Sequence, residues 1–254
     1  MNLTQSIIEA LESLGANKLR SGLTILGIVI GVGAVIAMLG VGRGAQETIT
    51  GSISGIGTNL LFVVSGGSED ISNPRPLTLS DSAAIADPFQ APSVLAVAPA
   101  IQGGATLTAS GEKMQSTIIG TTPEYFSMRN LTLTEGDFFT EADRLGYASV
   151  VVIGPDIAEE LFGRSDGVVG ETIRINGQPF RIIGLLVSKG GSMMGSQDAD
   201  VIMPLETAQV RILQRSDKQK VGMILVQVVD SDAITQATEE VAQILRQRHS
   251  TPVG

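Results

Sequence analysis

The sequence predicts an α+β protein with one N-terminal transmembrane helix, followed by an extracytoplasmic α+β module that carries a β-rich insertion. Three observations lead to this fold class. An uncharged apolar segment runs from Ser21 to Gly42, strand and helix patterns alternate at both ends of the remaining chain, and further strands fill the middle. Hydrophobic residues make up 43% of the chain, which is enough for a packed core beyond the anchor.

The apolar segment reads SGLTILGIVIGVGAVIAMLGVG and is long enough to cross a membrane. About 20 helical residues, at a rise of about 1.5 Å each, span the roughly 30 Å hydrocarbon layer of a bilayer. A secretory signal peptide is the alternative, but its apolar stretch is normally shorter, and no A-x-A cleavage site follows here. We therefore predict that residues 18–44 form a retained transmembrane helix in the lipid bilayer.

Basic residues on the two sides of this segment indicate its orientation. Lys18 and Arg20 precede it and only Arg43 follows closely, so the positive-inside rule places the N-terminus in the cytoplasm. Residues 1–42 carry two basic and two acidic side chains, so the net charge of −9 belongs to the residues that follow. Such an acidic domain does not attract nucleic acid. We expect a cell (inner) membrane protein whose residues after about 44 are extracytoplasmic, with no nucleic-acid partner.

The residues before the anchor have the pattern of an amphipathic helix. Apolar side chains recur at helical spacing on one face, namely Leu3, Ile7, Ala10, Leu11 and Leu14. Residues 1–17 are therefore predicted to form a helix at the cytoplasmic face of the membrane or in its interface. The alternative is that they are only the leader of the anchor.

Small residues within the anchor are candidates for helix packing. Gly27 and Gly31 form a GxxxG pair, and Gly33 follows two residues later. Glycines four residues apart flatten a helix face, which allows a second membrane helix to approach closely. Because the pattern is also common by chance in apolar helices, a packing face and an ordinary apolar helix both stay open.

The chain beyond the anchor begins with a strand–helix–strand pattern. Asn59–Ser65 is predicted as a strand. Thr78 or Ser80 is placed to cap a helix, and Asp81 in its first turn suits the positive end of the helix dipole. Val94–Ala98 is predicted as the next strand, ending before the proline that follows it.

The C-terminal part has one strand and one helix. Met223–Val229 is predicted as a strand, and the residues DSD after it supply an N-cap. An apolar stripe then recurs with helical period at Ile234, Ala237, Val241, Ile244 and Leu245. Arg246 and Arg248 lie where the C-terminal end of the dipole favours cations.

Strand patterns dominate between these two parts. The sequence from Glu171 to Val187 alternates around Asn176-Gly177, which are the residues that a type I′ hairpin turn requires. Ser149–Ile153 is predicted as a buried strand followed by a short helix, and Asp200–Met203 as the last strand of this region. We therefore predict that a β-rich insertion, residues 103–221, is set into an α+β module formed by both flanks.

Candidate chemistry is sparse. The chain has no cysteine, and its only histidine, His249, lies at the end of a predicted helix, where a solvated or capping role is expected. No G-x-S-x-G motif occurs, so a tethered hydrolase has no recognisable active site. We expect no catalytic residue, no cofactor and no metal site.

One loop, residues 188–200 (SKGGSMMGSQDAD), is a candidate for binding a partner or cargo. Met193 and Met194 lie among glycines and serines, and flexible thioethers at a loop tip suit varied apolar partners. The alternative is that both methionines fold back into the core.

Several segments together resemble the MacB-type ABC transporter permeases, the family of the macrolide exporter. The segments NKLRSGLTILGIVIGVGAVIAMLGVGRGAQ and SGIGTNLLFVVSGG resemble its start. The likeness continues in order through TPEYFSMRNLTLTEGDFF, VVVIGPDIAEELFG, VVGETIRINGQPFRIIGLL and EEVAQILRQRH. The ordered set spans nearly the whole chain and is more specific than any single segment.

The resemblance implies a permease that works as a homodimer or a pair, in which a cytoplasmic ABC ATPase subunit drives association of the membrane helices. It implies a MacB-like periplasmic core domain over 45–254, with a porter-like part at 55–102 and 222–250 around the insertion. A periplasmic adaptor is an optional further partner. In such a system the motion passes to the external domain, which handles the exported cargo.

The chain also departs from the family pattern. Family permeases have three further transmembrane helices, whereas no second apolar stretch of that kind and no G-x-x-x-x-G-K-[ST] motif occur here. We expect a piece of a longer permease or a truncated product. Two functions stay open, namely the N-terminal portion of an ABC export permease and a single-pass anchored binding or adaptor module that works without an ATPase.

Overall fold

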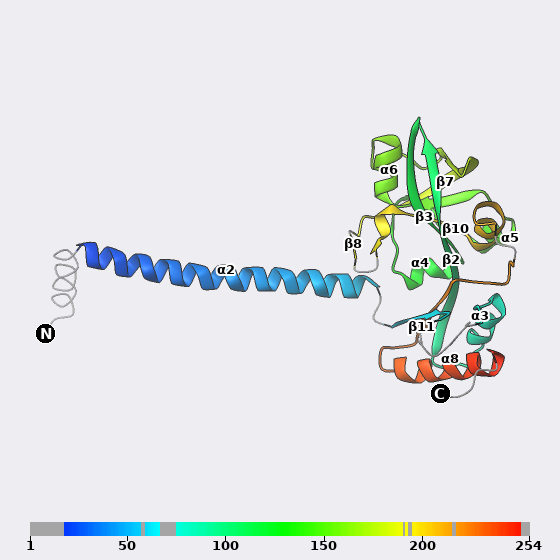
Figure 1. Ribbon diagram of the computed structural model, residues 1–254, viewed down its shortest axis with the longest axis horizontal. Helices are drawn as coiled ribbons and strands as arrows, with labels where there is room; N and C mark the ends of the chain where they lie inside the picture. Colours follow the sequence, from blue (N-terminus) through cyan, green and yellow to red (C-terminus); the bar gives the residue numbers. More distant parts are fainter. Residues whose placement is uncertain are drawn as a thin grey trace. The chain divides into compact units, whose positions relative to one another are not determined.

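A computed structural model describes residues 18–56, 59–66, 75–189, 191–192, 195–214 and 217–249 of the chain (Figure 1). The chain divides into two compact units, Met1–Gly51 and Ser52–Gly254. The helix predicted over residues 1–17 lies outside the described residues.

Helix α2 (Lys18–Ile56) contains the predicted membrane segment and continues well beyond it. Its stretch Gly22–Gly40 is long and apolar enough to cross a membrane. The apolar side chains of this stretch, such as Leu23 and Ile36, are exposed within the chain itself. The predicted bounds of the transmembrane part, residues 18–44, stay a prediction, because α2 continues past residue 44 without marking where a membrane would end. The segment contains no proline, and each glycine costs a helix only about 1 kcal/mol, so no residue type here forces an earlier end.

A mixed β-sheet organises the second unit. Among the described residues it has nine strands in the order β1–β11–β2–β3–β10–β5–β7–β4, and β6 pairs with both β2 and β7. Most neighbours are antiparallel, but β3 runs parallel to β10, and β5 to β7. The strands are Leu60–Val64 (β1), Val94–Ala109 (β2), Glu112–Thr121 (β3), Leu133–Gly136 (β4), Val150–Ile153 (β5), Thr172–Ile175 (β6), Gln178–Leu186 (β7), Asp200–Pro204 (β10) and Met223–Val228 (β11). A separate pair is formed by Gly191–Ser192 (β8) and Gly195–Ser196 (β9).

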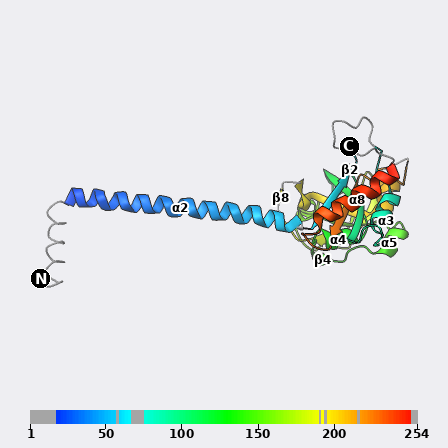
Figure 2. The same ribbon diagram turned by 90° about the horizontal axis from the view of Figure 1, so that it is seen from below.

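Helices connect the strands, and the longest of them in this unit is the last. The helices are Leu79–Ile85 (α3), Glu124–Met128 (α4), Glu141–Leu145 (α5), Pro155–Phe162 (α6), the 3₁₀ turn Gln197–Ala199 (η1), Leu205–Thr207 (α7), the π-helical turn Ala208–Ile212 (η2) and Ile234–His249 (α8). Helix α8 packs beside α3, although the two are far apart in the sequence (Figures 1 and 2).

Each face of the sheet has its own hydrophobic cluster. Ile118 of β3 and Val151 of β5 belong to the cluster that includes buried residues of α3, α6 and α8. Their neighbours Ile119 and Val152 belong to the second cluster, against which α4 packs. This alternation follows from the two-residue period of a strand. Because both faces of β5 are covered, its sequence VVVI is a continuous apolar run instead of an alternating pattern.

Strand β2 is longer than predicted and pairs with three other strands of the sheet. The prediction that it ends before Pro99 is wrong, because β2 continues to Ala109 and pairs with β11, β3 and β6. Pro99 is tolerated because β3 ends at Thr121, opposite the next residue of β2. There the Thr121 hydroxyl donates a hydrogen bond to the Pro99 carbonyl (3.0 Å). One strand therefore runs through both the predicted porter-like part and the predicted insertion.

Elements with strong local signals form as predicted. The hairpin of β6 and β7 is confirmed, and Asn176 and Gly177 at its turn have φ values of 49° and 82°, as a type I′ turn requires. Helix α3 is confirmed, with Thr78 and not Ser80 as its N-cap. Helix α8 is confirmed from Ile234 to His249.

Candidate functional site

The three glycines predicted to pack in the membrane, Gly27, Gly31 and Gly33, lie on open surface of α2 within the described residues. A Cβ atom built at Gly27, Gly31 or Gly33 has no heavy atom within 4 Å. At about 100° of rotation per residue, Gly27 and Gly31 share one face of α2, whereas Gly33 points about 200° away from Gly31. A packing role for Gly33 therefore requires the opposite face of the helix, which also contains Gly22 and Gly40.

The loop predicted to bind a partner is fastened at its base. Asp198 is 5% exposed and accepts hydrogen bonds from the Ser188 hydroxyl (2.7 Å) and the Lys189 backbone N–H (2.9 Å). Lys189 Nζ in turn donates to the carbonyl oxygens of Arg129 (3.1 Å) and Asn130 (2.7 Å), just past the end of α4. Met193 and Met194 lie outside the described residues. The base of this loop is thus fixed by hydrogen bonds, whereas the display of its methionines stays a prediction.

Buried charges gather at the base of this loop. Arg129 is only 7% exposed, and its guanidinium carbon lies 5.9 Å from the centre of the Phe62 ring. Burial raises the pKa of Asp200 to about 6 although the nearby charge of Arg129 opposes this. Burial and the charge of Arg129 both lower the pKa of Lys189. The group holds strand, helix and loop together.

Gly154 allows this loop to approach α6. A Cβ atom at Gly154 would lie 2.2 Å from the backbone oxygen of Asp198, far inside van der Waals contact. We expect Gly154→Ala to destabilise the domain by about 3 kcal/mol, because backbone cannot move aside as a side-chain tip can. Chemical denaturation of the detergent-solubilised chain measures this. The matched control is Gly104→Ala, whose Cβ would meet nothing within 4 Å. Equal stability of the two variants would contradict this account of the contact.

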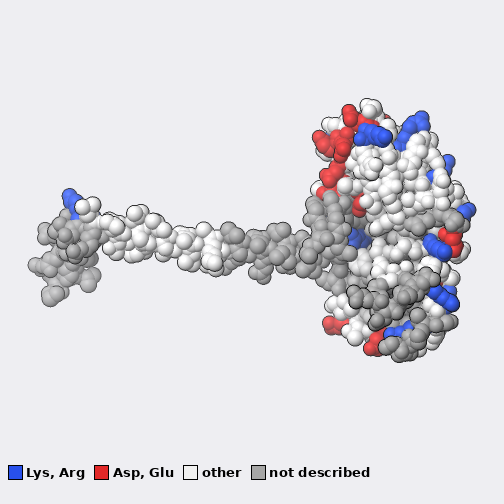
Figure 3. All heavy atoms as spheres, viewed as in Figure 1, with Lys and Arg blue, Asp and Glu red and all other residues white. Residues whose placement is uncertain are grey.

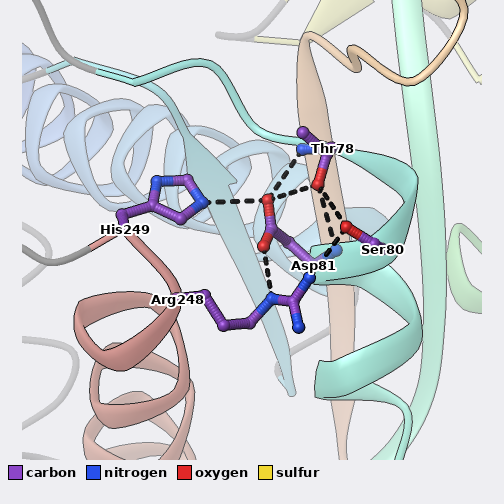
Figure 4. A network of polar contacts seen from close by, with 5 residues as sticks. All are labelled: Thr78, Ser80, Asp81, Arg248 and His249. Carbon is purple, nitrogen blue, oxygen red and sulfur yellow. Dashed lines mark hydrogen bonds and ion pairs between the residues drawn. The ribbon is translucent and has the colours of Figure 1, made fainter.

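Asp81 lies at the centre of a polar network between the start of α3 and the end of α8 (Figure 4). Thr78 and Asp81 form a capping box, in which each side chain accepts a hydrogen bond from the other backbone N–H (3.2 and 2.9 Å). Arg248 donates from Nε to Asp81 Oδ1 (2.7 Å) and from Nη2 to the Ser80 hydroxyl (2.7 Å). His249 Nε2 lies 2.9 Å from Asp81 Oδ2.

The environment of Asp81 keeps it ionised. Its side chain is 2% exposed, and burial alone would raise its pKa. The hydrogen bonds from Arg248, Thr78 and His249 outweigh burial and lower the pKa to about 2. The expectation that His249 is a solvated or capping residue is wrong, because its side chain is 16% exposed and contacts this carboxylate. Sequence reasoning missed the network because its members are separated by 168 positions.

A pocket of about 450 Å³ opens beside this network. It is lined by Arg75, Pro76, Thr78, Ser80, Asp81, Arg248 and His249. Among the described residues, no three His, Asp or Glu side chains come together as they would around a metal ion. With Arg75 and Arg248 beside Thr78 and Ser80, the lining offers cations and hydroxyls to a ligand, and no motif around Arg75 marked it as one of them.

Comparison with known proteins relates this architecture to export systems. A family model described as the MacB-like periplasmic core domain matches residues 21–244. The chain is 34% identical, over 97% of its length, to the macrolide export ATP-binding/permease protein MacB of Nitrobacter winogradskyi. It is 33% identical, over 96% of its length, to the pyoverdine export ATP-binding/permease protein PvdT of Pseudomonas entomophila. It covers 37% of each of these relatives, so it spans little more than a third of their length.

A solved structure supports the fold. The periplasmic region of MacB from Actinobacillus actinomycetemcomitans aligns with 78% of this chain and 88% of its own, with a TM-score of 0.64 and 23% identity. At this identity the likeness shows the fold alone, which is the α+β fold that the sequence predicts.

Proposed function

Because this chain belongs to the family of MacB-like periplasmic core domains, we propose that it is the N-terminal portion of an ABC-type export permease. The observation that carries the proposal is that the family model matches residues 21–244, and that these residues begin with an apolar stretch of membrane-crossing length, Gly22–Gly40. The N-terminus lies in the cytoplasm, and the residues after about 44 lie outside it.

The permease couples ATP hydrolysis to movement of the external domain. A separate cytoplasmic ABC ATPase hydrolyses ATP, and the chain itself contributes no catalytic residue. A second permease copy associates through the membrane helix, at the face that contains Gly27 and Gly31. The domain at 45–254 consists of a porter-like part, 55–102 with 222–250, and the insertion at 103–221. The names of the relatives, which combine ATP-binding with permease and export, support this coupling.

The loop at residues 188–200 contacts a partner, either cargo or a periplasmic adaptor. Its support is the fixed base at Asp198 and Lys189, which fastens both ends of the loop, and the sequence between them contains Met193 and Met194. We expect replacement of both methionines by serine to leave the melting temperature nearly unchanged, because displayed side chains add little to the core. Thermal unfolding of the detergent-solubilised chain measures this. A drop of several degrees would place the methionines in the core and contradict display.

Spin labelling tests the coupling directly. The chain has no cysteine, and Phe89 is 97% exposed, so Phe89→Cys provides a single label site on the external domain. The full permease and its ATPase are reconstituted in nanodiscs, with any cysteine beyond the printed sequence replaced. Distances between the labels of two copies are measured without nucleotide and with trapped ADP and vanadate.

We expect the distance distribution to shift between these two states. A variant ATPase that binds but does not hydrolyse ATP is the control, and it should not reach the vanadate-trapped distribution. If distances stay the same while the wild-type ATPase turns over, the coupling is contradicted, and the anchored adaptor without ATPase coupling becomes the better description.

A further inference from the structure

The pocket beside Asp81 has the chemistry of an anion site. Its lining is polar except for Pro76, and it contains two guanidinium groups, those of Arg75 and Arg248. Guanidinium groups pair with carboxylates and phosphates through two parallel hydrogen bonds. The question is which of these donors remain available for a ligand.

Asp81 and Ser80 position Arg248 without using all of its donors. The Asp81 carboxylate accepts a hydrogen bond from Nε, and the Ser80 hydroxyl accepts one from Nη2. Among the described residues, Nη1 of Arg248 makes no hydrogen bond. The side chain is thus held in one orientation, so a ligand need not order it on binding. Figure 4 shows Arg248 and His249 converging on Asp81 from the end of α8.

Arg75 has no assigned role inside the domain. Within the part of the chain that the structure describes, it makes no hydrogen bond and no ion pair, and it is exposed. Arg75 therefore brings a positive charge to the pocket wall that no described carboxylate compensates, whereas Arg248 and His249 already contact Asp81.

The pocket is positive although the protein is acidic. Arg75 and Arg248 contribute two positive charges, and ionised Asp81 contributes one negative charge, which leaves one positive charge with His249 neutral. The whole chain has a net charge of −9. Acidic side chains gather instead near α6, where Asp156, Glu159 and Glu160 are exposed (Figure 3). A local positive site in an acidic surface attracts anions selectively.

We propose that this pocket binds a small organic anion through a carboxylate or phosphate group held between Arg75 and Arg248. A volume of about 450 Å³ falls in the range of about 300–1,000 Å³ that is typical of small-molecule sites, and it exceeds what a bare ion needs. The site is independent of ATP coupling, so it stands or falls apart from the export proposal.

The single histidine makes the test specific. His249 lines the pocket and is the only histidine of the chain, so in a chain with ¹⁵N-histidine and no polyhistidine tag its imidazole gives the sole histidine signals. The full chain in detergent micelles is titrated with inorganic phosphate and, separately, with succinate at constant pH and ionic strength. We expect saturable shifts of the imidazole signals. The probe with the lower Kd identifies phosphate or carboxylate as the preferred group.

Two matched variants distinguish the pocket from general charge effects. Arg75→Gln should raise the Kd about tenfold, because it removes a charged hydrogen-bond donor from an exposed position that the fold does not use. Arg246→Gln removes the same charge from an exposed site on α8 outside the pocket, and it should change the Kd less than twofold. Shifts that never saturate with either anion, or equal effects of the two variants, would overturn the proposal.

Discussion

For the proposed permease, replacing Gly27 and Gly31 together by leucine is expected to weaken self-association of the membrane helix at least tenfold and to abolish export. Leucine side chains at these positions would hold a neighbouring helix away from the backbone, and close backbone contact replaces the hydrophobic effect as the source of association within lipid. Both positions are open within the chain, so the variant has no reason to misfold. Energy transfer between labelled copies in liposomes measures association.

Gly22→Leu with Gly40→Leu is the matched control. It adds the same apolar volume to the same helix, but on the opposite face, and neither added Cβ has a heavy atom of the described residues within 4 Å. We expect this control to associate normally. If the control loses association and the Gly27/Gly31 variant does not, the packing face is the one that contains Gly33.

Replacing Asp81 by asparagine is expected to destabilise the domain by about 3 kcal/mol. The substitution weakens a helix cap, which contributes about 1 kcal/mol, and removes the charge that Arg248 and His249 share. At this chain length we expect the melting temperature to fall by about 10 °C. Calorimetry of the detergent-solubilised chain measures the change.

Asp143→Asn separates the cap from the ion pairs. Thr140 and Asp143 form the same capping box at the start of α5, and none of the described cations pairs with Asp143. This control should cost only about 1 kcal/mol. Equal losses for Asp81→Asn and Asp143→Asn would mean that Arg248 and His249 add nothing.

The low pKa of Asp81 also sets a pH dependence. Its pKa is lowered from 3.8 to about 2 on folding, so the ionised carboxylate stabilises the folded state above pH 3.8. That contribution is lost as the pH falls through about 2. The stability difference between wild type and Asp81→Asn should therefore shrink as the pH falls from about 4 to about 2. A difference that shrinks already at pH 6 would contradict the assignment.

Local signals allowed part of the fold to be predicted from the sequence. The turn residues Asn176 and Gly177 restrict the backbone to one hairpin geometry, and the apolar stripe of α8 specifies a helix with one buried face. Helix α3 follows from its capping residues Thr78 and Asp81. In each case neighbours within a few positions carry the information.

The parts of the fold that could not be predicted depend on contacts between residues far apart in the sequence. Strand β3 reads EKMQSTIIGT, a weak pattern, and it is stabilised by β2 on one side and β10 on the other. The length of β2 likewise depends on its pairing with β3 and β6. These partners cannot be identified from the sequence of β2 itself. The network at Asp81 joins residues near both ends of the domain, so a lone histidine gave no indication of its partner.

Residue accessibility across the membrane tests the central claim most directly, namely that the acidic domain lies outside the cytoplasm and is anchored by α2. Because the chain contains no cysteine, Gln5→Cys and Phe89→Cys each provide one reactive site. Cells with a permeabilised outer envelope and an intact inner membrane are treated with a membrane-impermeant maleimide. We predict that Phe89→Cys is labelled at once and that Gln5→Cys is labelled only after lysis. Labelling of Gln5→Cys with protection of Phe89→Cys in these cells before lysis would contradict the account.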